Sequence, residues 1–156
     1  MNKCLILFVE GDTEVEFYKR VVANARRLHP ANRFDTYIEY RNVKGVPPVN
    51  WSEVEQELRK NGASQIIHVR ARHSIEDWFL YDTEGIMEFL RLGKNTKVIG
   101  RNGYDKLQNL YRRANKVYFK GVKSNDMIAR LDIDKIVNSV RDQLKPLYDV
   151  LGVKPK

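Results

Sequence analysis

A short apolar run that ends in an acidic turn constrains the fold of this chain more than any other feature. Residues 5–9 (Leu-Ile-Leu-Phe-Val) are uncharged and are followed at once by Glu10 and Gly11. Such a run is typical of a strand buried on both faces, and the glycine allows a sharp turn into a following helix. We therefore expect Glu10 at the carboxyl end of a central strand, the edge where ligands bind in open α/β sheets.

Hydrophobic periodicity predicts how the chain continues. Apolar residues at helical spacing between residues 15 and 28 indicate an amphipathic helix. Thr13 and Glu16 have capping-box spacing, so Thr13 is the expected N-cap, and Pro30 is expected to end the helix. Strict alternation over residues 34–40 predicts a half-exposed edge strand.

A second strand-to-helix junction is expected after a loop. A glycine and two prolines between residues 42 and 50 predict the loop, and a short helix is expected over residues 51–59. Residues 64–71 include Ile-Ile-His-Val, which is typical of a second buried parallel strand. Ser74 and Asp77 again have capping-box spacing, so a helix is predicted to begin where this strand ends.

The last third of the chain is predicted to be mainly helical. Polar helical segments are expected over residues 104–114 and 133–151, with a strand-like piece at residues 117–119. The order β-α-β-α-β-α predicts an α/β fold, a small mostly parallel sheet flanked by helices, with a helical C-terminal part. A length of 156 residues with 42% hydrophobic content fits a single domain, residues 1–156, in which residues from about 100 to 156 form a helical C-terminal extension.

The charge and the cysteine content limit the partners and the compartment. A net charge of +8 makes an acidic polymer, DNA or RNA, the expected macromolecular partner. The single Cys4 cannot form an internal disulfide, which favours a reducing compartment. The sequence shows no signal peptide and no apolar run long enough to span a bilayer, so we expect a cytoplasmic protein without a membrane partner.

Acidic residues gather at the two junctions. If the strands that contain Leu5 and Ile66 are neighbours in a parallel sheet, Glu10, Glu76 and Asp77 converge at one edge. Paired carboxylates suit Mg²⁺ or Mn²⁺, which prefer hard oxygen ligands. An equally simple explanation of Glu76 and Asp77 is that acids are favoured in the first turn of a helix.

His73 stands next to the second junction. An imidazole at this place would assist proton transfer or contact a phosphate, because histidine titrates near neutral pH. The alternative is a partly exposed polar residue without a chemical role.

Two motifs resemble a known family. Residues 9–14 (Val-Glu-Gly-Asp-Thr-Glu), followed by Phe17 and Tyr18, are similar to the opening motif of the TOPRIM domains in OLD-family and RloB-like nucleases and their small phage or mobile-element relatives. Residues 74–80 resemble the later acidic helix start of the same group. The resemblance covers the first two thirds of the chain. It implies a TOPRIM-like fold in which Glu10 acts as general base or metal-site acid in phosphodiester chemistry, and acids at the second junction complete the metal site.

The chain departs from this family at one point. TOPRIM domains carry an Asp-x-Asp pair at the end of a middle strand, but no such pair lies between Glu10 and Glu76. The Asp-x-Asp of residues 132–134 comes too late in the chain and is better explained as an N-cap and a first-turn acid. The missing strand would fall at the loop of residues 45–48, so a shortened or degenerate relative is expected.

Basic residues support a second interpretation. Cations interleaved with aromatic residues can neutralise phosphates while the aromatics stack on bases. The alternative is a solvated helical surface whose aromatics face the core. The predicted nucleic-acid-binding residues are Arg70, Arg72, Arg101, Lys106, Arg112, Arg113, Lys116 and Lys120.

Two functions are therefore expected. The first is a Mg²⁺- or Mn²⁺-dependent nuclease of prokaryotic or phage defence, in which Glu10 and His73 are catalytic and Glu10, Glu76 and Asp77 bind the metal. The second is a catalytically inactive TOPRIM relative that binds nucleic acid or a protein partner through its basic surface. A homodimer is a further possible assembly. A third possibility is a shortened form of a longer active enzyme.

Overall fold

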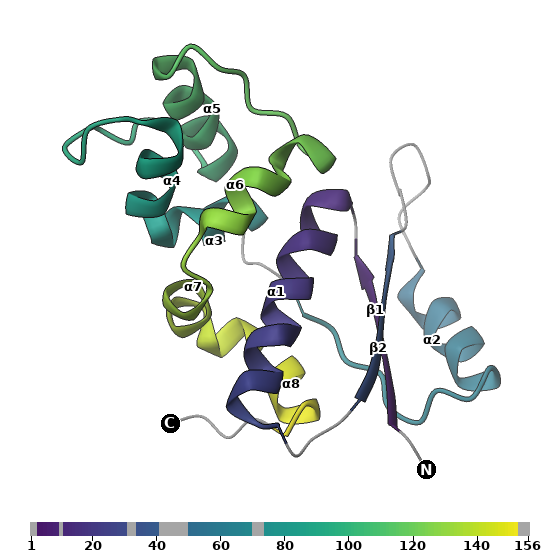
Figure 1. Ribbon diagram of the computed structural model, residues 1–156. Helices are drawn as coiled ribbons and strands as arrows, with labels where there is room; N and C mark the ends of the chain where they lie inside the picture. Colours follow the sequence, from purple (N-terminus) through teal and green to yellow (C-terminus); the bar gives the residue numbers. More distant parts are fainter. Residues whose placement is uncertain (1–2, 10, 31–33, 41–49, 70–73, 153–156) are drawn as a thin grey trace.

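The protein is predominantly helical (Figure 1). The computed structural model describes residues 3–9, 11–30, 34–40, 50–69 and 74–152. In chain order the elements are β1 (Lys3–Val9), α1 (Asp12–Leu28), β2 (Phe34–Tyr40), α2 (Trp51–Lys60), α3 (Ile75–Phe79), η1 (Leu80–Asp82), α4 (Thr83–Leu90), α5 (Gly103–Arg113), η2 (Val122–Ser124), α6 (Asn125–Arg130), α7 (Ile133–Ser139) and α8 (Arg141–Val150).

The predicted α/β fold class, a small mostly parallel sheet flanked by helices, is wrong. Within the described residues the strands form one parallel pair, β1 with β2, in which Leu5 lies opposite Thr36. Residues 64–69 form no strand, although Ile67 and Val69 are half-buried against the core. A short apolar run can bury its side chains in this way without joining a ladder, and periodicity alone does not distinguish the two cases.

The strand-like segment 117–119 is likewise not a strand. The side chains of this segment do alternate between exposed and buried, since Val117 and Phe119 are exposed while Tyr118 is buried. No described strand lies beside it to accept hydrogen bonds, so the alternation serves only to place Tyr118 in the core.

Strand β1 also differs from its prediction as a strand buried on both faces. Its side chains alternate: Leu5 and Leu7 pack against the core, whereas Cys4, Ile6 and Phe8 are exposed. Helix α1 lies against one face of the strand pair (Figure 1). The opposite face leaves about half of the Ile6 and Phe8 surface in contact with solvent.

Most predicted helices are confirmed. The segments predicted at residues 51–59 and 104–114 correspond to α2 and α5. The segment predicted at 133–151 is two helices, α7 and α8, which are separated at Val140. Ser139 donates its hydroxyl hydrogen bond to the carbonyl of Lys135 at 2.8 Å, a contact that competes with the helical ladder.

Helix α1 begins two residues earlier than predicted, because Gly11 is its N-cap. The prediction of Thr13 as N-cap is therefore wrong. Thr13 lies inside the helix and is buried, and its Oγ1 accepts a hydrogen bond from the backbone N–H of Gly121 at 2.7 Å. Ser124 donates its hydroxyl to the same atom at 3.3 Å. Thr13 thus holds the start of η2 against α1.

The core is centred on α1, which lies between the strand pair and helices α6 and α7 (Figure 1). Phe17 is fully buried, and its ring lies 5.5–5.8 Å from the rings of Tyr18, Trp78 and Phe79. Aromatic pairs at this separation and tilt are favourable beyond the area that they bury. Residues from the first, middle and last parts of the chain therefore share one core.

Phe17→Ala is expected to lower the free energy of unfolding by about 3–5 kcal/mol, because it opens a cavity at the aromatic centre of the core. Phe8→Ala is the matched control, since it removes the same atoms from a side chain that is 47% exposed. Its expected cost is below about 1.5 kcal/mol. Urea denaturation measures both values, and equal losses would contradict the packing described here.

Candidate nucleic-acid interface

Glu76, predicted as a metal ligand, is completely buried at the start of α3. Its Oε1 accepts a hydrogen bond from the Tyr118 hydroxyl at 3.3 Å and lies 3.1 Å from the ammonium of Lys120. Lys120 is half-exposed, so one buried carboxylate is compensated by one cation at the surface. The other oxygen, Oε2, is buried and has no hydrogen-bond partner in the part of the chain that the structure describes.

The buried Tyr118 is influenced by carboxylates from both acidic junctions, as the causes of its raised pKa show. Burial is the largest cause that raises the pKa of its phenol, followed by the negative charge of Glu76 and, more weakly, that of Glu14 near the start of α1. The phenol is therefore a neutral hydrogen-bond donor under all ordinary conditions. Carboxylates from both junctions thus act on the same buried tyrosine.

The predicted capping box of Ser74 and Asp77 is confirmed. Its Oδ2 accepts hydrogen bonds from the backbone N–H of Ser74 at 3.1 Å and from the Ser74 hydroxyl at 2.9 Å. A Cβ added to Gly103 would lie 2.7 Å from the Asp77 Cγ, so only glycine allows α5 to start against this carboxylate. The side chain fixes the contact between α3 and α5.

The remaining residues of the predicted acidic site lie outside the described residues. Glu10 and His73 fall in this group, as do the predicted phosphate contacts Arg70 and Arg72. Among the residues that are described, no three His, Cys, Asp or Glu side chains are grouped to hold a metal ion. The metal-binding roles of Glu10, Glu76 and Asp77 stay predictions.

The Asp-x-Asp of residues 132–134 has the structural role that the sequence predicted. Asp132 is the N-cap of α7 and accepts a hydrogen bond from the Lys135 N–H at 3.1 Å. Asp134 lies 2.7 Å from the guanidinium of Arg27 and also accepts a hydrogen bond from Asn24. Both carboxylates hold α7 in place.

Sequence reasoning missed a further buried carboxylate, Asp82. Its Oδ2 accepts a hydrogen bond from the Asp132 N–H at 2.7 Å, and its Oδ1 accepts one from the Gly85 N–H at 3.3 Å. The second contact is an N-cap bond, and an aspartate three residues before a glycine at a helix start is the sequence signal that could have revealed it.

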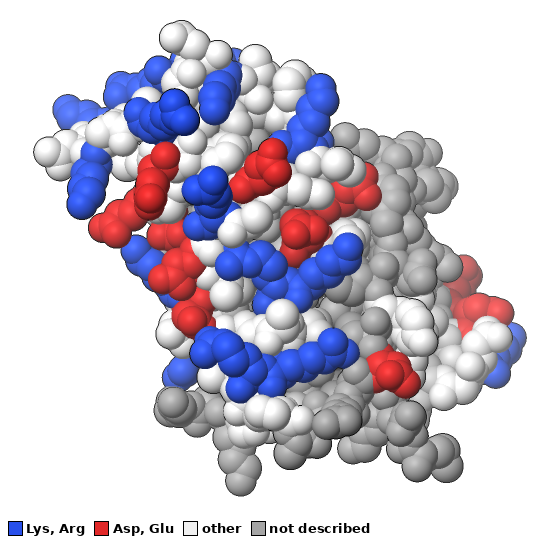
Figure 2. Space-filling view, in the orientation of Figure 1, with Lys and Arg blue, Asp and Glu red and all other residues white. Residues whose placement is uncertain are grey.

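The predicted basic residues fall into two groups. Arg112, Arg113 and Lys116 are exposed at the end of α5 and have no carboxylate partner among the described residues. Arg101 instead pairs with Asp105 at 3.2 Å, and Lys120 pairs with Glu76. Lys106 is half-buried. Figure 2 shows Lys and Arg side chains gathered over the region of α4 and α5.

Most of the interleaved aromatic residues face the core, as the alternative interpretation predicted. Tyr111 and Tyr118 are buried, and their rings lie 5.3 Å apart. Phe119 is 51% exposed and carries the Lys123 ammonium 4.7 Å from its ring centroid. Base stacking on this surface is therefore open to Phe119 rather than to the two buried tyrosines.

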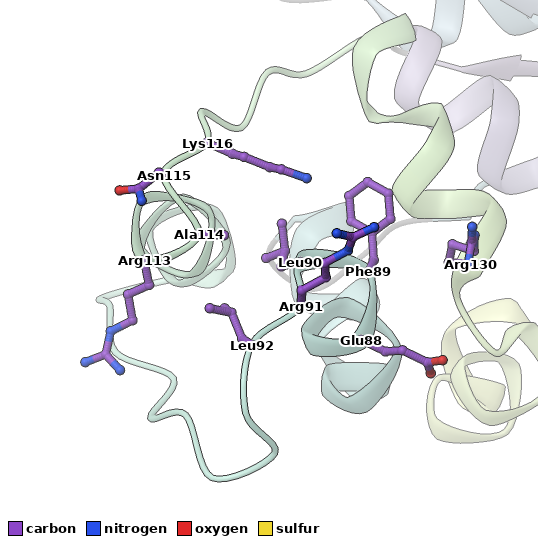
Figure 3. Close-up of a pocket in the computed structure, with 10 residues that line it drawn as sticks. All are labelled: Glu88, Phe89, Leu90, Arg91, Leu92, Arg113, Ala114, Asn115, Lys116 and Arg130. Atoms are coloured by element: carbon purple, nitrogen blue, oxygen red, sulfur yellow. The ribbon is translucent and has the colours of Figure 1, made fainter.

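A hollow of about 600 Å³ opens beside the exposed end of α5 (Figure 3). Arg91 at the end of α4 and Arg130 at the end of α6 line it together with Arg113 and Lys116. The sequence pattern did not single out Arg91 or Arg130, because they are far apart in the chain. They come together only where the ends of α4 and α6 lie beside the end of α5. Among the described residues that line this hollow, Glu88 is the one carboxylate.

Comparisons with known proteins assign this chain to no family. No family model, no curated protein and no solved structure matches the chain. The resemblance to TOPRIM nucleases therefore stays a prediction. In the part of the chain that the structure describes, no helix combines the length and apolar character needed to cross a membrane.

Tyr111 is expected to make the free energy of unfolding fall as the pH rises through the alkaline range. Burial, and then the negative charge of Asp126, raises the pKa of Tyr111 to about 12. Below its unfolded-state pKa of about 10 the phenol is neutral in both states. Above that pH the unfolded chain releases the proton first, so the free energy of unfolding falls until the folded protein also ionises.

Tyr111→Phe is expected to flatten this decline by up to about 2–3 kcal/mol between pH 10 and pH 12. Burial also raises the pKa of Tyr118 and Tyr148, so part of the alkaline slope should remain. Urea denaturation across this pH range measures the difference. Identical slopes for the native chain and the variant would contradict the assignment.

Proposed function

We propose that this protein binds nucleic acid through the basic surface formed by the adjoining ends of α4, α5 and α6. One observation carries the proposal: five exposed cations on these helix ends have no carboxylate partner among the described residues. Phosphate groups, which repeat along a nucleic-acid strand, are the partners that such a group of cations neutralises. The five cations are Arg91, Arg112, Arg113, Lys116 and Arg130.

Helix dipoles alone do not account for this charge. Cations are favoured at helix C-termini, where the dipole is equivalent to about half a negative charge per helix. Three helix ends would thus balance fewer than two of the five cations. Glu88 balances one more, so positive charge is left for an anionic partner.

The chemistry favours backbone contacts over base reading. Exposed arginine and lysine side chains contact phosphates of any sequence, and the buried Tyr111 and Tyr118 cannot stack on bases. Binding should be salt-dependent and weakly selective. A cytoplasmic location, expected from the sequence, would give access to both DNA and RNA.

Arg112→Glu/Arg113→Glu is expected to weaken binding of a fluorescent oligonucleotide by about 10–100-fold and to lower its salt slope by about 1–2, because two phosphate contacts are lost. Fluorescence anisotropy at several salt concentrations measures both quantities.

Arg59→Glu/Lys60→Glu is the matched control. This pair occupies the last turn of α2, as Arg112 and Arg113 occupy the last turn of α5, and both pairs are exposed. The two double variants change the net charge by the same amount, and each places two negative charges at the C-terminal end of a helix. A similar loss of affinity in both would mean that net charge, and not this surface, drives binding.

Metal-dependent phosphodiester cleavage is a second candidate function. The observation that favours it is the Oε2 atom of Glu76, a carboxylate oxygen that is buried and finds no hydrogen-bond partner among the described residues. A cation is one way to compensate such an atom. Glu10, which precedes α1 by two positions, is the general base that the family resemblance implies.

Glu10→Ala is expected to abolish the heat of Mg²⁺ or Mn²⁺ binding and any metal-dependent cleavage, and to leave oligonucleotide binding intact. Isothermal titration calorimetry and a nuclease assay measure the two effects. Glu84→Gln, which neutralises an exposed acid on α4, should change neither. If the native chain binds no metal, or if Glu10→Ala binds it equally well, the enzyme function is excluded.

A further inference from the structure

The hollow between the ends of α4 and α5 combines an apolar wall with cations. Phe89, Leu90 and Leu92 supply the apolar surface on the α4 side, and Ala114 supplies it on the α5 side. In Figure 3, Arg91 and Lys116 extend from opposite walls toward the space beside Phe89, whereas Arg113 and Glu88 point away from it. The Lys116 ammonium lies 5.3 Å from the centroid of the Phe89 ring.

Two similar turns, at the C-terminal ends of α4 and α5, position the two walls of the hollow. Arg91 follows α4 and Asn115 lies just after α5, and both have left-handed backbones, with φ of 57° and 56°. In each turn the next residue closes the helix end: Leu92 N–H donates to the Met87 carbonyl at 2.8 Å, and Lys116 N–H donates to the Tyr111 carbonyl at 2.9 Å. These bonds satisfy helix carbonyls that would otherwise attract the nearby cations.

Arg91 occupies a position that favours glycine. A left-handed backbone is strained for residues with a Cβ, and glycine is the usual residue in this place at a helix end. The arginine therefore carries a conformational cost without any carboxylate partner among the described residues. Strain of this kind is a reason to examine a residue for a binding role.

We propose that this pocket holds one nucleotide unit of the bound strand, a proposal that rests on the nucleic-acid-binding function. The phosphate lies between the guanidinium of Arg91 and the ammonium of Lys116, which are charge-assisted donors to phosphate oxygens. The base lies against the apolar wall of Phe89 and Leu92, and a hollow of about 600 Å³ has room for it. An anion alone would leave this apolar wall in water.

Arg91→Gly tests the site without damaging the fold. The substitution removes the guanidinium and also relieves the left-handed strain, so the melting temperature should stay the same or rise. Affinity for a short oligothymidylate should fall about tenfold, as expected for the loss of a charge-assisted contact. Unchanged affinity would overturn the proposal.

Asn115→Gly is the matched control. It also replaces a left-handed residue by glycine at the corresponding turn of α5 and lies on the same pocket, but it removes no charge. The strain that it relieves is smaller than at Arg91, because asparagine tolerates a left-handed backbone better than arginine does. Its affinity for oligothymidylate should equal that of the native chain. A tenfold loss here as well would mean that turn rigidity, and not the Arg91 charge, governs binding, and would also overturn the proposal.

Three small probes distinguish a nucleotide site from a simple anion site. Thymidine 5′-monophosphate should bind more tightly than thymidine or inorganic phosphate, and NMR titration should shift the amide signals of residues 89–92 and 114–116. Inorganic phosphate that binds as tightly as the monophosphate would overturn the nucleotide assignment.

The failure of this proposal is separable from failure of the proposed function. Oligothymidylate binding that depends on Arg112 and Arg113 but not on Arg91 would overturn the pocket and leave nucleic-acid binding in place. Absence of any oligonucleotide binding by the native chain would overturn both.

Discussion

Burial of α1 on opposite sides is the constraint on which the rest of the structure depends. Thr13 and Val22 lie on opposite sides of the helix and are both buried, so the helix requires cover from both the strand pair and the later helices. Polar side chains fix where that cover lies: Arg20 donates hydrogen bonds of 2.6 Å to the carbonyls of Ile128 and Leu131, and Thr13 accepts one from Gly121. These contacts join residues more than 100 positions apart, and leaving their buried groups unpaired would be costly. The last third of the chain is therefore part of the central core.

The sequence predicted the helices well because their signals are local. Helix α5 has Leu107 and Leu110 at helical spacing, and both are fully buried, while Ser74 and Asp77 form the expected cap of α3. The sheet was overpredicted because a strand requires a partner, and pairing is not a local property. Ile67 and Tyr118 have the apolar pattern of strand residues, yet each meets the core without a ladder. Long-range hydrogen bonding decides between these outcomes, and single-sequence periodicity does not contain it.

The candidate interface was predicted in part for the same reason. Arg112, Arg113 and Lys116 are neighbours in the chain, so their density was visible in the sequence. Arg91 and Arg130 join them only because α4 and α6 end beside α5, which is a tertiary arrangement. The family resemblance drew attention to the carboxylates of the two junctions instead. It did not reveal that Tyr118 and Lys120, more than 40 residues further along the chain, would enclose Glu76.

The two signs of charge have different roles in this molecule. Several carboxylates act inside the fold: Glu76 pairs with Lys120, Asp77 caps α3, Asp82 binds the start of α7, and Asp134 binds Arg27. Each of these carboxylates satisfies a buried or helix-end donor, which stabilises helices too short to be stable alone. Because these acids are committed to internal contacts, they do not neutralise the arginines and lysines at the ends of α4, α5 and α6. Positive charge without a carboxylate partner among the described residues is thus left where these helix ends meet, and this is the surface at which we propose an anionic partner.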